Sequence, residues 1–189
     1  MEIVLLEIAG ATTAMLYLFL ISQRSWTAWP ACIISSCLYM AIFWSSQLYA
    51  EAALQLFFIG MGVVGWRAWA RIDGPARVVS LSQREHQVTM VIIAVLTLVL
   101  AGMLYSSTPA GFYALPDAFV LVGSIAATFL TVRRVTENWY YWMVINGVSA
   151  LVYASKGIWL TCALGAMYLC LSVRGLMMWR AGESPKASE

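Results

Sequence analysis

The sequence predicts an all-α integral membrane protein with seven transmembrane helices, arranged as two parallel three-helix repeats joined by one inverting helix. Three observations predict this fold class: the composition, the apolar segments and an internal repeat. Of the 189 residues, 62% are hydrophobic and only 11% are charged, whereas a soluble domain carries roughly 25% charged residues. A water-soluble fold cannot bury so much apolar surface, so we expect the lipid bilayer to surround the chain.

Seven segments are apolar enough to cross the hydrocarbon core, which takes about 20 residues in a helix. They are residues 3–22, 26–45, 48–70, 88–106, 116–132, 138–154 and 157–179. The expected divisions are a first three-helix repeat at 1–70, a hydrophilic cytoplasmic loop at 71–87, a linker transmembrane helix at 88–106, a second repeat at 107–179, and a polar, disordered cytoplasmic tail at 180–189.

Basic residues predict the orientation of these segments. Ten of the eleven Lys and Arg residues fall on one side of the membrane, and only Lys156 falls on the other. The positive-inside rule places the ten in the cytoplasm, which puts the N-terminus outside and the C-terminus inside.

The internal repeat appears when the chain is aligned with itself at a shift of 110 positions, without gaps. The identical pairs include Arg24 with Arg134, Trp29 with Trp139, Gly65 with Gly175, and Trp69 with Trp179. Chance identity between apolar segments is the alternative explanation, but hydrophobic composition alone would not align basic residues and tryptophans. Parallel repeats are typical of transporters, in which the substrate binds near mid-membrane where the repeats meet.

One face of the segment at 138–154 carries candidate binding residues. Trp139, Trp142, Asn146, Ser149 and Tyr153 follow one another at spacings of 3, 4, 3 and 4, which places them on one side of a helix. Aromatic rings can stack on a planar ligand or contact a positively charged ring, and an amide can hydrogen-bond a polar edge. The alternatives are an interfacial aromatic belt for Trp139 and interhelical hydrogen bonding for Asn146.

The first repeat contains four further candidates. Gln55 is a polar group inside an apolar segment, for which a binding role is the default and helix–helix bonding the alternative. Glu51 lies near the outer end of the same segment, where it either attracts a cation or is merely interfacial. Ser36 aligns with Asn146 in the repeat, and Tyr39 lies one turn further on.

Motifs for catalysis and metal binding are missing from the sequence. It contains no Walker loop, no HExxH and no set of nucleophile and base. The four cysteines form no CxxC pair, and the single histidine, His86, falls in the predicted polar loop. We therefore expect no enzymatic activity, no cofactor, no metal and no nucleic-acid partner.

Four stretches carry a family resemblance. They are RSWTAWP at 24–30, LYAEAALQ continuing to GWRAW at 48–69, ENWYYWMVIN at 137–146, and YASKGIWLTCA at 153–163. These stretches resemble the motifs of the PnuC-type vitamin transporters, bacterial inner-membrane proteins that are similar in architecture to the SWEET sugar transporters. The likeness covers nearly the whole chain.

The resemblance implies facilitated diffusion of a vitamin precursor, most often nicotinamide riboside, which a cytoplasmic kinase then phosphorylates and traps. It places substrate binding on Trp142 and Asn146, with Trp139 beside them, and on Gln55. Thiamin is the alternative substrate because it also carries a cationic aromatic ring, while other members take riboflavin or deoxynucleosides. A structural or sensory membrane protein is a more remote alternative. The expected partners are the vitamin and the lipid bilayer, and a homo-oligomer is left open.

Overall fold

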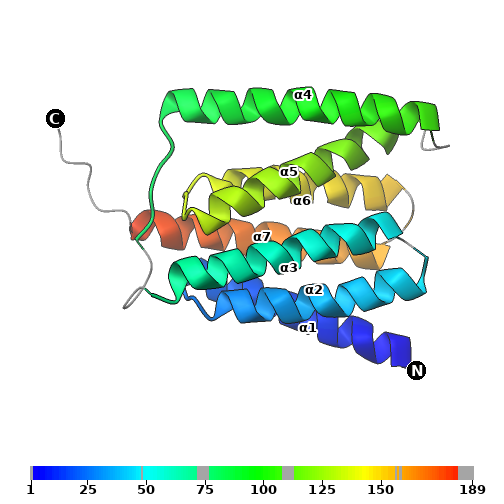
Figure 1. Ribbon diagram of the computed structural model, residues 1–189, viewed down its shortest axis with the longest axis horizontal. Helices are drawn as coiled ribbons and strands as arrows, with labels where there is room; N and C mark the ends of the chain where they lie inside the picture. The colour runs from blue at the N-terminus through cyan, green and yellow to red at the C-terminus, as the bar shows by residue number, and fades with distance from the viewer. Residues whose placement is uncertain are drawn as a thin grey trace. The chain divides into compact units, whose positions relative to one another are not determined.

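The computed structural model describes residues 2–47, 49–71, 77–107, 113–155, 157 and 159–182. This part of the chain contains seven α-helices (Figure 1). They are α1 (Glu2–Ser22), α2 (Ala28–Ser45), α3 (Tyr49–Trp69), α4 (Gln83–Ser107), α5 (Ala114–Val132), α6 (Asn138–Ser155) and α7 (Trp159–Ala181). The all-helical class and the approximate position of every helix agree with the predictions from the sequence.

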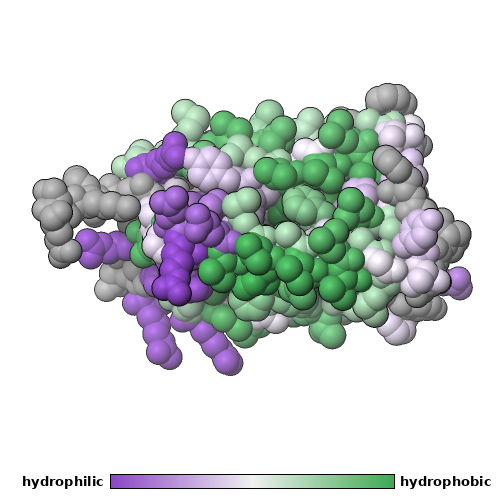
Figure 2. Space-filling model, turned by 90° about the horizontal axis from the view of Figure 1, so that it is seen from above, coloured by the Kyte–Doolittle hydropathy of each residue, from purple (hydrophilic) through white to green (hydrophobic). Residues whose placement is uncertain are grey.

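Five of the described helices, α1 to α5, are long and apolar enough to cross a membrane, judged by length and composition. Figure 2, seen from the α4 side, shows apolar residues over the middle of the helices and hydrophilic residues gathered towards their ends. Large apolar side chains such as Leu98, Leu151 and Met177 are exposed, as expected where lipid replaces water as the solvent. The chain is a multi-pass membrane protein.

The chain divides into two compact units. The first comprises Met1–Arg77 and Met177–Glu189, and the second comprises Val78–Leu176. In the first unit, α2 packs against both α1 and α3, and in the second, α5 packs against both α4 and α6. The helix α7 lies against α6, because Gly175 faces the indole of Trp139.

The helices α1 and α5 end in the same kind of turn. Arg24 after α1 has a φ of 60°, and Arg134 after α5 has a φ of 62°. The backbone N–H of the next residue donates to the carbonyl five positions earlier, at 3.1 Å after Arg24 and 2.9 Å after Arg134. This is the Schellman motif, whose left-handed position usually holds glycine. The same local structure therefore recurs at the shift that aligns the two halves of the sequence.

Each half also buries an indole against a glycine. Trp29 and Trp139 are almost fully buried. A Cβ atom added at Gly65 would overlap the indole of Trp29, and one added at Gly175 would overlap the indole of Trp139. The absence of a side chain at these glycines allows close helix packing.

Contacts at the start of α4 fix it to the turn between α5 and α6. Val79 forms a parallel β-bridge with Val135. The backbone N–H of Leu81 donates to Oε2 of Glu137 at 3.0 Å. Ser82 and Glu85 then form a reciprocal capping box, with the Ser82 N–H donating to Glu85 Oε2 at 2.9 Å and the Glu85 N–H to Ser82 Oγ at 3.3 Å.

The predicted loop at 71–87 was therefore too long. The capping box starts α4 at Gln83, so His86 lies in the first turn of a helix rather than in a polar loop. The sequence carried a signal for this start, because Ser82 and Glu85 have the spacing of a capping box.

Candidate functional site

The two central candidates on α6 are both half-buried and both hydrogen-bonded to other helices of the second unit. The indole Nε1–H of Trp142 donates to Oγ1 of Thr131 on α5 at 3.3 Å. The side-chain Nδ2–H of Asn146 donates to Oγ of Ser172 on α7 at 3.3 Å. These contacts hold an aromatic ring and an amide one helical turn apart.

The partner of Trp142 belongs to a buried polar chain. Thr131 is 1% exposed and Asn138 is fully buried. The Thr131 hydroxyl lies 3.1 Å from Oδ1 of Asn138 and 2.8 Å from the carbonyl oxygen of Ala127. Nδ2 of Asn138 in turn donates to the carbonyl of Val135 at 2.6 Å. The position of Trp142 is thus linked to the turn between α5 and α6.

The partner of Asn146 is also buried. The Ser172 hydroxyl donates to the carbonyl of Tyr168 on its own helix at 2.8 Å. Among the described residues, the bond to Ser172 is the one hydrogen bond that the structure gives to the Asn146 side chain. Its carbonyl oxygen Oδ1 accepts no hydrogen bond from the residues that the structure describes.

The other predicted residues of α6 lie in different surroundings. Trp139 is buried against Gly175, a location that favours a packing role. Ser149 is half-buried, and Tyr153 is exposed. A substrate contact remains a prediction for these three residues.

In the first unit, Ser36 is buried, and its neighbour Ser35 donates to the carbonyl of Gly10 on α1 at 3.2 Å. The ring of Tyr39 lies over Gly10 and stacks on Phe43 at a centroid distance of 5.8 Å. In α3, Gln55 is half-buried and Glu51 is exposed. The structure therefore places Tyr39 on the side of α2 that contacts α1, and it buries Ser36 within the first unit.

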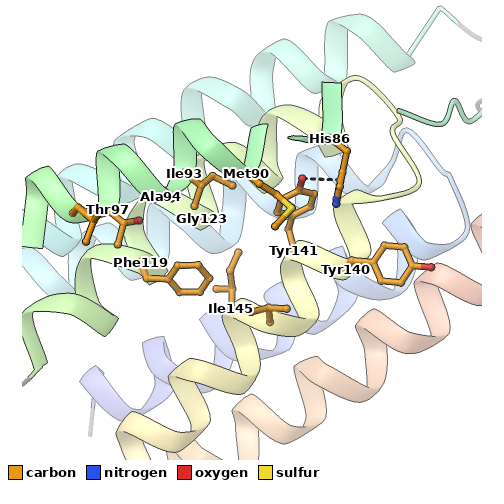
Figure 3. A pocket seen from close by; sticks show the side chains of 12 residues that line it. His86, Met90, Ile93, Ala94, Thr97, Phe119, Gly123, Tyr140, Tyr141 and Ile145 are labelled. Atoms are coloured by element: carbon orange, nitrogen blue, oxygen red, sulfur yellow. Dashed lines mark hydrogen bonds between the residues drawn. The ribbon is translucent and has the colours of Figure 1, made fainter. Parts of the chain in front are cut away.

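A cavity of about 490 Å³ lies among α4, α5 and α6 (Figure 3). Its lining is almost entirely apolar and includes Met90, Ile93, Phe119 and Ile145. At one end, the Tyr141 hydroxyl and Nδ1 of His86 lie 3.0 Å apart in a hydrogen bond. Tyr141 and Ile145 lie on a different face of α6 from Trp142 and Asn146, so this cavity is not the site that the sequence predicts.

Three residues beside the candidates were missed from the sequence: Thr131, Asn138 and Ser172. Asn138 lies within ENWYYWMVIN, at the start of α6 and four positions before Trp142. Thr131 and Ser172 lie 11 and 26 positions from the residues that they contact. Periodicity within α6 carries no information about such partners on other helices.

Comparison with known proteins extends these findings. Residues 4–181 match the model of a family described as nicotinamide mononucleotide transporter. The chain is 26% identical over 212 aligned positions to the nicotinamide riboside transporter PnuC of Escherichia coli (strain K12), covering 92% of this chain and 84% of that protein. It is 24% identical over 178 positions to the riboflavin/roseoflavin transporter RibM of Streptomyces davaonensis, covering 92% and 83%.

The fold is similar to a crystal structure of the vitamin B3 transporter PnuC, with a TM-score of 0.76 at 23% sequence identity. The likeness covers 93% of this chain and 80% of that one.

Proposed function

Because the chain belongs to the nicotinamide mononucleotide transporter family, we propose that it carries nicotinamide riboside into the cell by facilitated diffusion. The observation that carries the proposal is the pair of side chains on α6, Trp142 and Asn146, each held by a hydrogen bond to another helix. The E. coli relative, a nicotinamide riboside transporter, supports the choice of substrate.

The chemistry of this pair suits a flat, positively charged ring. The pyridinium ring of nicotinamide riboside would stack on the indole of Trp142, where the negative face of the π-system attracts a cation. The amide of Asn146, one turn further along α6, would hydrogen-bond a polar substituent of that ring. Cytoplasmic phosphorylation of the released riboside would then make uptake net inward.

The proposed architecture has seven membrane spans in a 3+1+3 arrangement, with the N-terminus outside and the C-terminus in the cytoplasm. The matching turns at Arg24 and Arg134, and the matching burial of Trp29 and Trp139, support two equivalent three-helix bundles. The concentration of basic residues on one predicted side supports the orientation.

Further substrate contacts are proposed from both halves of the chain. They would come from Gln55, Glu51, Ser36 and Tyr39 in the first half, and from Trp139, Ser149 and Tyr153 in the second. The half-buried position of Gln55 is consistent with such a contact.

Riboflavin is a second candidate substrate, because the riboflavin/roseoflavin transporter RibM matches over 92% of this chain. Its ring system is flat but uncharged, so it would stack on Trp142 without the cation–π contribution. Thiamin shares the cationic ring of nicotinamide riboside and belongs in the same comparison.

The test is stabilisation of the purified protein by each vitamin, followed by uptake into proteoliposomes. A ligand at 100 times its dissociation constant adds about 2.7 kcal/mol to the free energy of unfolding. We expect nicotinamide riboside to raise the Tm and to enter proteoliposomes only until the concentrations on both sides are equal. A shift with riboflavin or thiamin alone would reassign the substrate, and no shift with any vitamin would contradict the proposal.

The residue-level test is Asn146→Leu, with Tyr140→Phe as its control. We expect Asn146→Leu to abolish the ligand-induced rise in Tm because the substituted side chain cannot form hydrogen bonds. Tyr140→Phe should leave that rise unchanged, because Tyr140 is partly exposed on another face of α6. Unaltered uptake by a folded Asn146→Leu protein would show that the site is elsewhere.

A further inference from the structure

We propose that Thr131 and Ser172 are positioning residues that determine which atoms Trp142 and Asn146 present to the substrate. The inference rests on the proposed function, because it concerns the same site. Neither hydroxyl needs to touch the substrate, and each acts through the side chain to which it is hydrogen-bonded.

The Thr131 hydroxyl has one proton, and both of its neighbouring oxygens are acceptors. Its proton therefore goes to the Ala127 carbonyl or to Oδ1 of Asn138, and its own oxygen accepts the indole N–H of Trp142. With that N–H occupied, Trp142 has no donor left for a ligand. It presents only the face of its ring, which selects a flat and preferably cationic partner.

The same reasoning fixes the orientation of the Asn146 amide. The Ser172 hydroxyl donates to the carbonyl of Tyr168, and with its proton there the Ser172 oxygen accepts from Asn146. The Nδ2 group must then point towards Ser172, which leaves Oδ1 as the atom available to the ligand. An acceptor at this place requires a donor on the ligand, such as the N–H of a ring carboxamide.

The site would thus accept the carboxamide form of the riboside and disfavour the carboxylate form. A carboxylate offers acceptors only, so its oxygens would face Oδ1 of Asn146 without a proton between them. One helical turn separates Trp142 from Asn146, a rise of about 6 Å. A substituent attached directly to a ring stacked on Trp142 can reach that far.

The first half of the chain shows that these polar groups are not required by the backbone. The turn after α1 has the same two Schellman hydrogen bonds and the same left-handed arginine as the turn after α5. It is built with Ile21 and Ala28 at the positions that align with Thr131 and Asn138. The turn itself therefore folds without this hydroxyl and this amide.

The experiment measures KM and Vmax for nicotinamide riboside with full-length protein in proteoliposomes. The variants are Thr131→Val, Thr131→Ser and Ser172→Ala, with Thr128→Val as the matched control. Thr128 is also buried on α5, but its hydroxyl donates only to the carbonyl of Ser124 at 2.7 Å among the described contacts. Competition by the carboxylate riboside is measured for every protein, including the unsubstituted one.

We expect Thr131→Val and Ser172→Ala to raise KM about threefold to tenfold, the loss that corresponds to one hydrogen bond. Thr131→Ser and Thr128→Val should keep the original KM. The unsubstituted protein should reject the carboxylate riboside. In Ser172→Ala the side-chain amide of Asn146 is free to rotate and to present Nδ2 to the ligand. This variant should therefore discriminate less strongly between the carboxamide and the carboxylate riboside.

An unchanged KM and an unchanged preference in both variants would overturn the inference, as would equal competition by the two ribosides in the unsubstituted protein. That last measurement needs no variant, so a folding defect in Thr131→Val does not obscure it. Absence of nicotinamide riboside uptake by the unsubstituted protein is a different result, which contradicts the proposed function. The KM series is then measured with the vitamin that does bind, where the same hydroxyl dependence is expected.

Discussion

At the scale of single residues, two indoles each pack directly against a glycine of a neighbouring helix. Trp29 covers Gly65 in the first unit, and Trp139 covers Gly175 in the second. Both indoles are almost fully buried, so neither can move aside easily. A methyl group added at either glycine must displace a large ring in a closely packed interior.

We predict that Gly175→Ala and Gly65→Ala each lower the free energy of unfolding by about 1–3 kcal/mol, the usual cost of overpacking. Gly60→Ala is the matched control, because nothing lies within 4 Å of a Cβ built at Gly60. Thermal unfolding in detergent should show a lower Tm for the first two variants and an equal or higher Tm for the third. Equal Tm values for all three would contradict the packing described for the indoles.

Single residues also show what the sequence could and could not reveal about the site. The helical spacing of Trp142 and Asn146 predicted their common face. Their partners could not be predicted, because a contact between helices depends on how each helix is rotated about its axis. The same limit applies to Trp139, whose burial against Gly175 is not visible in the spacing along α6.

At the scale of elements, the two Schellman turns carry arginine where glycine would be easier to accommodate. A left-handed conformation costs a residue with a Cβ roughly 1–2 kcal/mol. An arginine there still places a positive charge at the C-terminal end of a helix, where the macrodipole favours it. The protein therefore combines a strained backbone position with a favourable charge at the end of α1 and again at the end of α5.

We predict that Arg134→Gly raises the free energy of unfolding by about 1 kcal/mol, because glycine removes the left-handed strain. Its neighbour Arg133 has a φ of −75°, an ordinary helical value. Arg133→Gly should therefore leave the Tm unchanged or lower it, since glycine there only adds conformational freedom to the unfolded chain. Identical Tm changes in the two variants would argue against strain at Arg134.

The start of α4 offers a second test at this scale. Glu137→Ala removes the carboxylate that accepts the backbone N–H of Leu81. We expect hydrogen exchange at the Leu81 amide to become about tenfold faster, which corresponds to a loss of roughly 1.4 kcal/mol. Glu137→Gln keeps an acceptor oxygen and should show a smaller change. Unchanged exchange at Leu81 in the alanine variant would contradict this attachment.

The helices themselves were predictable because long apolar runs separated by short polar connections leave few alternatives in a membrane. The start of α4 was not found, because hydropathy counts residues such as Ser82 and Glu85 as loop. Their side chains instead satisfy backbone groups at the helix start. Polar residues can thus belong either to a loop or to the start of a helix. A Ser followed three positions later by a Glu indicates the start of a helix.

At the scale of the whole molecule, the C-terminal end of α7 is hydrogen-bonded to the C-terminal end of α1 and the turn after it, within the first unit. The indole of Trp179 donates to the carbonyl of Ile21 at 3.0 Å, and a guanidinium N–H of Arg24 donates to the carbonyl of Gly182 at 3.4 Å. The end of α7 is therefore fixed to the turn that follows α1. This explains why residues at both ends of the sequence belong to one compact unit.

The proposed orientation is tested with reporter fusions after the last residue. We predict that green fluorescent protein fused to the C-terminus fluoresces and that alkaline phosphatase fused there is inactive, because the basic residues hold this end in the cytoplasm. A matched pair of fusions at Gln47, in the turn between α2 and α3, should give the opposite result. Active phosphatase at the C-terminus would show that this end lies outside the cytoplasm, which contradicts the proposed orientation.

The matching turns after α1 and α5 make the first half of this chain an internal reference for engineering the second. The turn after α1 folds with Ile21 and Ala28 at the positions where the second half has Thr131 and Asn138. Libraries aimed at new transport selectivity can therefore vary those two positions with residues taken from the first half as starting points. Substitutions chosen in this way change the chemistry around Trp142 while keeping a turn that the same protein already builds.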